Sequence, residues 1–171
     1  GDAVWLETGA GRRFLAIHAT AAGARGTAVV VHGIGVHPDH GVIGVLRSRL
    51  ADLGWSTLSI QMPVLAADAR ADDYYPAVFP EAADRIARAG AWLAARGERR
   101  LALVSHSMGS WMANAYFDAA QDSPYAAWAC LGLTGGYSLA TWFSPRPILD
   151  VHGEHDLEPS VSAAWRRRLT L

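Results

Sequence analysis

The sequence contains no lysine, because all 15 of its basic residues are arginines. Within these residues a lysine Schiff base or a lysine general base is therefore excluded. Cysteine is nearly absent too. The single Cys130 cannot form an internal disulfide, and it lies in an apolar run where we expect a small buried hydrophobic side chain.

Long apolar runs and a strong net charge are also lacking. No apolar segment reaches the roughly 18 residues that a membrane span needs. The net charge is −1, which gives no electrostatic basis for binding nucleic acid or an anionic membrane. No signal peptide is visible, but the sequence starts at Gly1 without a methionine. A soluble protein is expected, either cytoplasmic or exported after removal of a signal.

What the sequence does contain is a regular alternation of apolar runs and amphipathic segments, in a chain of 171 residues. This alternation predicts one α/β domain over residues 1–171, with a mostly parallel sheet and helices on both faces. Strands are expected at 4–7, 13–19, 27–32, 55–61, 101–104, 127–133 and 147–152. Helices are expected at 38–53, 81–96, 108–120 and 160–168.

Residues 66–80 are polar and hold two neighbourhoods in which proline adjoins an aromatic residue. We expect a long loop, and long loops in compact domains are often functional. Its aromatic side chains Tyr74, Tyr75 and Phe79 either line a substrate pocket or anchor the loop.

Three polar segments follow predicted parallel strands, at the sheet edge where α/β proteins place their sites. The first is His-Gly-Ile-Gly at residues 32–35. The second is Ser-His-Ser-Met-Gly at 105–109, in which Ser107 lies on a turn between a strand and a helix. The third is Gly-Glu-His-Asp at 153–156.

These segments, in this order, resemble the α/β-hydrolase superfamily, and the resemblance covers residues 27 to 168. The first segment resembles the oxyanion loop of that family. The second resembles its nucleophile elbow, Gly-His-Ser-Met-Gly, with Ser105 in place of the first glycine. The third, together with the strand before it, resembles the segment that carries the triad acid. The compact spacing is similar to that of bacterial members with a small lid or none.

The resemblance implies a role for each matching residue. Ser107 is the expected nucleophile, and Asp156 is the expected acid that orients the base. The backbone N–H groups of Ile34 and Met108 are expected to form the oxyanion hole. Asp150 is a rival acid, although its place inside the predicted strand fits less well.

Four further residues are expected to support the site rather than to react: His32, Gly33, His106 and Gly109. His37 and His40 have no third partner at zinc-like spacing, so no metal is expected. No cofactor is expected either. A dinucleotide site is disfavoured because the glycines at 33 and 35 are not followed by the third glycine of the G-x-G-x-x-G pattern.

The expected catalytic base is missing. In this fold the order is serine, acid, then histidine, yet no histidine follows His155. The last strand and helix of the family are missing as well, so we expect the domain to be incomplete at its C-terminal end. The alternatives are that His155 or His37 serves as the base, or that the protein is not catalytic. Residues 134–146 are also short compared with the family, which often carries longer inserts at this position.

Two functions stay open at this stage. The first is a serine hydrolase that cleaves a carboxylic ester of a small molecule through an acyl-enzyme on Ser107. The second is a binding or scaffold protein that keeps the fold without the triad histidine. Neither the substrate nor the oligomeric state follows from the sequence.

Overall fold

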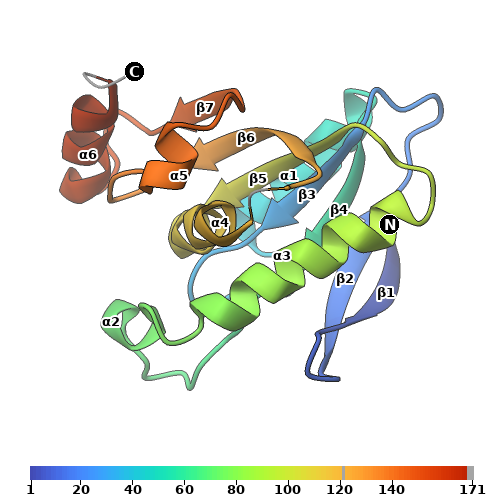
Figure 1. Ribbon diagram of the computed structural model, residues 1–171, viewed down its shortest axis with the longest axis horizontal. Helices are drawn as coiled ribbons and strands as arrows, with labels where there is room; N and C mark the ends of the chain where they lie inside the picture. Colours follow the sequence, from blue (N-terminus) through green and yellow to red (C-terminus); the bar gives the residue numbers. More distant parts are fainter. Residues whose placement is uncertain (121, 169–171) are drawn as a thin grey trace.

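A mixed seven-stranded sheet forms the centre of the computed structural model, which describes residues 1–120 and 122–168 (Figure 1). The strand order is β1-β2-β4-β3-β5-β6-β7. Strand β2 pairs antiparallel with β1 and β4, and all other neighbours are parallel. The strands are β1 (Asp2–Glu7), β2 (Arg13–Ala19), β3 (Thr27–Val31), β4 (Ser56–Ile60), β5 (Leu101–His106), β6 (Tyr125–Leu131) and β7 (Ile148–Val151). The predicted mostly parallel α/β sheet is therefore confirmed.

The two strands at the middle of the sheet are buried along their whole length. Every residue of β3 and β4 is inaccessible to solvent. A parallel strand covered on both faces favours a continuous run of β-branched residues, and β3 carries Val29, Val30 and Val31 in succession. This run explains why β3 occupies a central position.

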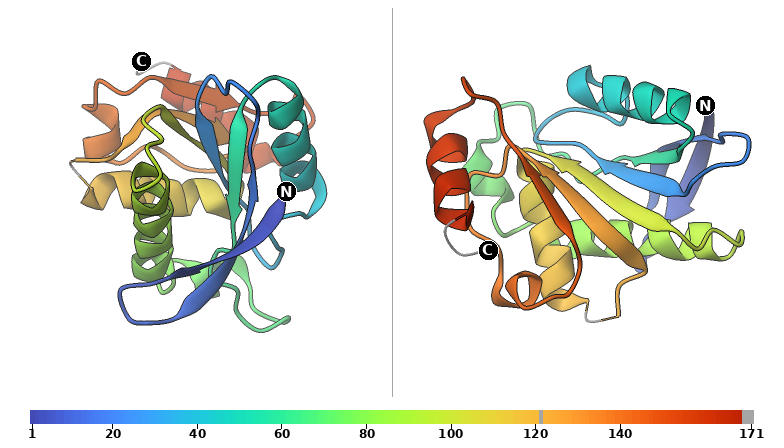
Figure 2. Two further views of the ribbon diagram at one scale, coloured as in Figure 1. Left: turned by 90° about the vertical axis from the view of Figure 1, so that its right-hand side faces the viewer. Right: turned by 90° about the horizontal axis from the view of Figure 1, so that it is seen from above.

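Helices cover both faces of the sheet, as expected (Figure 2). On one face α1 (Gly41–Asp52) packs its Ile43 against Val30 and Val104. On the other face lie α3 (Phe79–Ala94) and α4 (Met108–Ala119), which bury Ile86 and Met112 in the main core. The predicted apolar face of α3 is confirmed, because Ala82, Ile86, Ala89 and Leu93 are all buried.

The prediction that residues 66–80 form one long loop is wrong. The segment contains the short helix α2 (Ala71–Tyr74), and α3 already begins at Phe79. Proline is favoured in the first turn of a helix, so Pro80 opens α3 rather than ending a loop. Tyr74 is buried, and its hydroxyl accepts a hydrogen bond from the Leu65 N–H at 2.8 Å. This side chain anchors the segment.

Other differences concern the ends of elements and one short helix. The helix expected from residue 38 begins at Gly41, and β6 runs from Tyr125 to Leu131 rather than from 127 to 133. Helix α5 (Leu139–Trp142) was not predicted. It is a single turn capped by the Ser138 side chain, which accepts from the Thr141 N–H, and one turn is too short to show a helical period.

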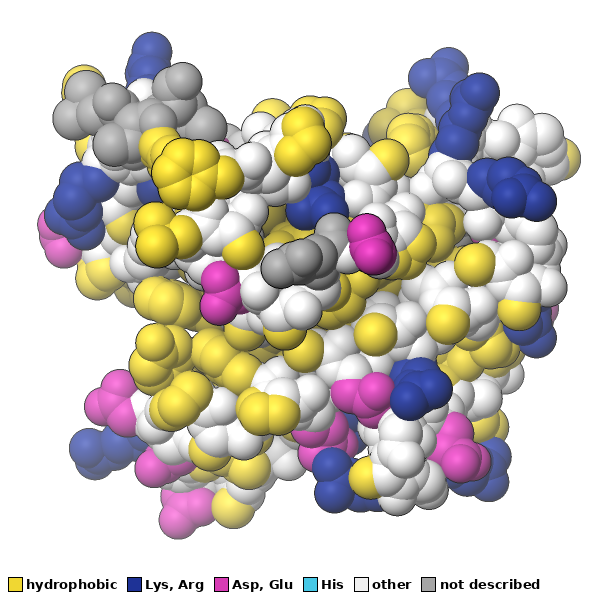
Figure 3. Space-filling model, viewed as in Figure 1, with side chains coloured by type: hydrophobic (Ala, Val, Ile, Leu, Met, Phe, Trp, Pro, Cys, Tyr) yellow, Lys and Arg dark blue, Asp and Glu magenta, His cyan; other side chains and the backbone are white. Residues whose placement is uncertain are grey.

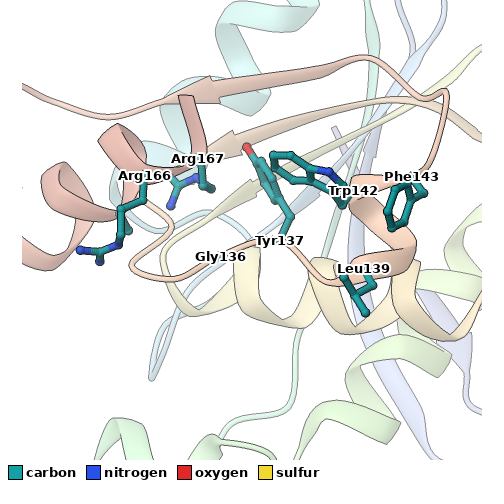
Figure 4. Close-up of a pocket in the computed structure, with 8 residues that line it drawn as sticks. Gly136, Tyr137, Leu139, Trp142, Phe143, Arg166 and Arg167 are labelled. Carbon is teal, nitrogen blue, oxygen red and sulfur yellow. The ribbon is translucent and has the colours of Figure 1, made fainter. Parts of the chain in front are cut away.

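The last helix, α6 (Glu158–Arg168), is held to the sheet by a buried arginine (Figure 4). The Arg167 guanidinium donates two hydrogen bonds to the Asp150 carboxylate on β7, at 2.6 and 2.9 Å. It also donates to the backbone carbonyls of Leu133 and Gly135. The Tyr137 hydroxyl donates to the same carboxylate at 3.0 Å. One side chain thus connects α6, β7 and the segment after β6.

No helix within residues 1–120 and 122–168 has the length and apolar character needed to cross a membrane.

Candidate active site

Ser107 lies on a strained turn between β5 and α4. Its backbone angles are φ 55° and ψ −126°, and within residues 1–120 and 122–168 no other non-glycine residue has a positive φ. Such a conformation disfavours any residue with a Cβ, and it persists only where the surrounding structure enforces it. Strain of this kind concentrates at functional sites, so the turn itself is evidence for a site at Ser107.

Hydrogen bonds beneath the turn enforce this conformation. The Ser107 N–H donates to the Leu131 carbonyl at 2.9 Å, which ties the turn to the end of β6. The Ser105 hydroxyl accepts from the Trp128 indole N–H at 2.8 Å and is 3.0 Å from the Ser110 hydroxyl. Ser105 therefore fastens β5 to β6 and to α4. The sequence identified this residue only as a departure from the expected glycine.

The loop after β3 lies directly against Ser107. A Cβ atom built on Gly33 would be 3.1 Å from the Ser107 Cβ and 3.5 Å from its Oγ. The N–H groups of Ile34 and Met108 have no hydrogen-bond partner in the described part of the chain. Met108 is also the first residue of α4, where the helix dipole favours negative charge. Two backbone donors without partners therefore lie near the Ser107 turn, one on the loop after β3 and one at the start of α4.

Gly109 permits this close approach of α4 to the end of β3. A Cβ atom at this position would be 2.9 Å from the Val31 carbonyl oxygen and 3.0 Å from the His32 carbonyl carbon. Backbone atoms of a central strand cannot move aside, so only glycine fits here.

His32 is buried, and both of its ring nitrogens are engaged. Nδ1 is 2.7 Å from the Gly33 carbonyl oxygen, and Nε2 accepts a hydrogen bond from the Met62 N–H at 2.9 Å. These contacts require the neutral ring with its proton on Nδ1. Burial lowers the pKa of His32 to about 4, partly opposed by the bond to Gly33. The ring braces the Gly33 loop and is not available to take a proton from Ser107.

This low pKa predicts a loss of stability in mild acid. The unfolded chain gains a proton at His32 below pH 6.5, whereas the folded protein stays neutral there until about pH 4. The free energy of unfolding should therefore fall between pH 6.5 and 4, by up to about 3 kcal/mol from this residue. The lowered pKa values of His18 and His106 act in the same direction. Urea titrations at pH 7.5, 6 and 5 measure the slope. His32→Asn should show a shallower slope than wild type, and equal slopes would contradict the prediction.

Asp156 lies on the loop after β7 and is exposed. Its Oδ1 accepts a hydrogen bond from the Leu157 N–H at 2.8 Å, and its Oδ2 would be 3.4 Å from a Cβ built on Gly132. Its charge also acts on His106, whose pKa is lowered by burial and partly raised again by Asp156. The acid loop is therefore near the end of β5. The rival Asp150 is engaged by Arg167 instead.

A base is not assigned by these contacts. The Ser107 hydroxyl has no hydrogen-bond partner within residues 1–120 and 122–168. His40 and His106 line a cleft with Ser107 but make no hydrogen bond to it. The alternative bases His37 and His155 are exposed and make no hydrogen bond to Ser107 either. No group of three or more metal-ligating side chains occurs in the described residues.

Two clefts adjoin the turn. The Ile34 cleft, of about 320 Å³, is lined by Ser107, His106, Gly33 and Ile34 together with the start of α1. The Met108 cleft, of about 270 Å³, starts at the residue after Ser107 and lies between α2 and α4. Its lining residues are Ala71, Asp72, Tyr75, Met108, Trp111 and Thr134. Of the aromatic residues on the segment 66–80, Tyr75 therefore lines a cleft while Tyr74 is an anchor.

Comparison with known proteins gives a consistent picture of the fold. Residues 1–84 match the family described as "Protein of unknown function (DUF3530)". No curated protein matches the sequence. A dienelactone hydrolase from Anabaena variabilis is similar with a TM-score of 0.75 and 20% identity, over 99% of this chain and 80% of its own.

Two further solved structures are similar at lower identity. A putative alpha/beta hydrolase from Agrobacterium tumefaciens has a TM-score of 0.70 and 15% identity, over 99% of this chain and 80% of its own. An esterase from Pyrococcus furiosus has a TM-score of 0.64 and 13% identity, over 78% of this chain. The matched region spans about half, 52%, of that esterase. Taken with the strand order and the turn at Ser107, these similarities establish that the chain has the α/β-hydrolase fold.

Proposed function

We propose that the protein is a serine hydrolase that cleaves a carboxylic ester of a small molecule. The observation that carries this proposal is the strained turn at Ser107, a nucleophile elbow with unused N–H donors of Ile34 and Met108 beside it. A serine hydroxyl held outside the hydrogen-bond network next to anion-stabilising donors is arranged for nucleophilic attack. The names of the similar structures, which include esterases and a dienelactone hydrolase, support the same class of reaction.

The reaction has two halves. In the first, Ser107 Oγ forms a bond to the ester carbonyl carbon and its proton passes to a base. The carbonyl oxygen becomes an oxyanion that accepts hydrogen bonds from Ile34 and Met108. The carbon–oxygen bond to the alcohol then breaks, and the alcohol leaves with the proton. In the second half, water attacks the acyl-enzyme and releases the acid. One oxyanion donor is worth about 3 to 4 kcal/mol in such reactions.

We propose that the base is a histidine outside residues 1–171, oriented by Asp156. Two facts support this placement. The Ser107 hydroxyl has no partner in the described chain. In the two structures that align with 99% of this chain, about a fifth of each chain has no counterpart here. In this proposal His32, Gly33, His106 and Gly109 hold the turn and the loop in place.

Covalent labelling tests the proposal. The protein encoded by the full reading frame is treated with a fluorophosphonate probe, digested and analysed by mass spectrometry. We expect one labelled peptide, with the probe on Ser107, because attack on phosphorus uses the same nucleophile, base and oxyanion donors as attack on an ester.

Ser107→Ala is the test variant and should lose labelling completely. Ser48→Ala, which removes an exposed hydroxyl on α1 that lines neither cleft beside the turn, is the matched control and should keep the label on Ser107. A folded full-length protein that is not labelled at Ser107 would overturn the proposal. It would favour the alternative that the fold serves only for binding.

A further inference from the structure

The Met108 cleft carries chemistry that ester cleavage does not require. One carboxylate and two aromatic rings line this cleft, and Met108, the residue after Ser107, lines it too. We propose that Asp72, Tyr75 and Trp111 bind an alkylammonium group of the substrate, so that the preferred substrates are esters with a cationic moiety. This proposal rests on the proposed function and adds the substrate class to it.

The aromatic walls are held in fixed positions. The Trp111 indole N–H donates to the Thr134 hydroxyl at 3.0 Å, and Gly135 packs against the ring so closely that no Cβ would fit. Tyr75 packs on Trp111 with 5.4 Å between ring centroids and 74° between the planes, although 54% of the residue remains exposed. Rings fixed before binding lose little entropy when a ligand arrives. An aromatic surface of this kind attracts ammonium groups through the negative face of the ring.

The charge on this wall has one sign. Among the residues that the structure describes, Asp72 is the one charged residue that lines the Met108 cleft. Its carboxylate has no ion pair or hydrogen bond in the described chain, whereas the neighbouring Asp73 caps α2 by accepting from the Arg70 N–H at 2.7 Å. A carboxylate without a protein partner beside two aromatic rings is suited to a cation from outside.

The negative character continues along the wall. A second cleft, of about 290 Å³, shares Tyr75 and Trp111, and within the described part of the chain its one charged lining residue is Asp118. Hydrophobic side chains gather on the face that contains α2, α4 and α5 (Figure 3). The path that leads away from Met108 is therefore apolar with acidic groups and without basic ones among its lining residues.

Kinetics with isosteric esters test this inference. In one arm the cation is on the alcohol: acetylthiocholine is compared with 3,3-dimethylbutyl thioacetate, in which carbon replaces the quaternary nitrogen. In the other arm the cation is on the acyl group: a trimethylammonioacetyl ester is compared with its 3,3-dimethylbutanoyl analogue. In one of the two arms, the ratio of kcat/KM for the cationic ester to that for the neutral ester should fall about tenfold in Asp72→Asn.

Asp68→Asn is the matched control. It removes the same charge from an exposed position of the same segment, and Asp68 does not line either cleft. This variant should keep the wild-type ratio. Tyr75→Leu should lower the ratio like Asp72→Asn, which separates a specific site from a general effect of net charge. Intrinsic reactivity differs between the esters, but it cancels when variants are compared.

Isothermal titration calorimetry of choline binding, with 3,3-dimethylbutanol as the neutral comparison, separates the two proposals. Ester cleavage in which the ratio is unchanged by Asp72→Asn in both arms would overturn the inference and leave the hydrolase function standing. A protein that cleaves no ester but binds choline, and loses this binding in Asp72→Asn, would overturn the hydrolase function and keep the cation site. Absence of both activity and choline binding would overturn both.

Discussion

Replacing Gly109 by alanine should remove most of the stability of the folded protein. In an ordinary helix, replacing glycine by alanine increases the free energy of unfolding by up to about 1 kcal/mol, because alanine has the higher helix propensity. Here the new Cβ would collide with the backbone of Val31 and His32 at the end of β3. Because β3 is buried and paired on both sides, α4 would have to move away from the sheet. We expect a loss of more than about 3 kcal/mol in the free energy of unfolding.

Urea denaturation followed by circular dichroism measures this loss, and Gly136→Ala is the control. A Cβ at Gly136 has no atom within 4 Å, and this glycine does not have a positive φ. The control should stay within about 0.5 kcal/mol of wild type. If Gly109→Ala were as stable as Gly136→Ala, the described contact between α4 and β3 would be wrong.

Replacing Arg167 by methionine should have an effect of similar size for a different reason. Only 2% of the Arg167 side chain is exposed, and the Asp150 side chain that it binds is 17% exposed. The variant removes both guanidinium donors of the Asp150 carboxylate, which keeps the Tyr137 hydroxyl, and it removes the donor of the Leu133 and Gly135 carbonyls. Removing one partner of a buried ion pair typically costs about 3 to 5 kcal/mol. Chemical denaturation measures the cost.

The double variant Arg167→Met with Asp150→Leu shows where that energy comes from. Most of the penalty should come from the carboxylate left unpaired, so the double variant should recover part of the stability that Arg167→Met loses. A double variant that is less stable than Arg167→Met would show that the pair itself, rather than the unpaired charge, is responsible.

The central part of the fold could be predicted from the sequence because its signals are local. The valine run of β3 and the spacing of Ala82, Ile86, Ala89 and Leu93 on α3 each encode one element, and the structure contains both. The prediction for the segment 66–80 is wrong because a proline such as Pro80 is as typical of a loop as of the first turn of a helix. Burial of Tyr74 decides between these, and burial depends on the tertiary structure.

The candidate site could be predicted only in part. Motifs indicated Ser107, Ile34 and Met108, because these residues closely follow predicted strands in the sequence. The role of Ser105 as acceptor for Trp128 involves a partner 23 residues away that no local pattern connects. The ion pair of Arg167 with Asp150 is equally invisible in the sequence, since both residues are ordinary charged residues there. Such contacts follow from packing and not from periodicity.

The pairing of Val31 with Ser105 has a consequence for how the protein acquires its site. The Gly33 loop and the Ser107 turn extend directly from these two residues, so they meet only when β3 has paired with β5. Contacts between residues so distant in sequence form slowly, because the intervening chain must first lose its freedom. We therefore expect the candidate site to assemble late in folding, after the local elements of the chain have formed.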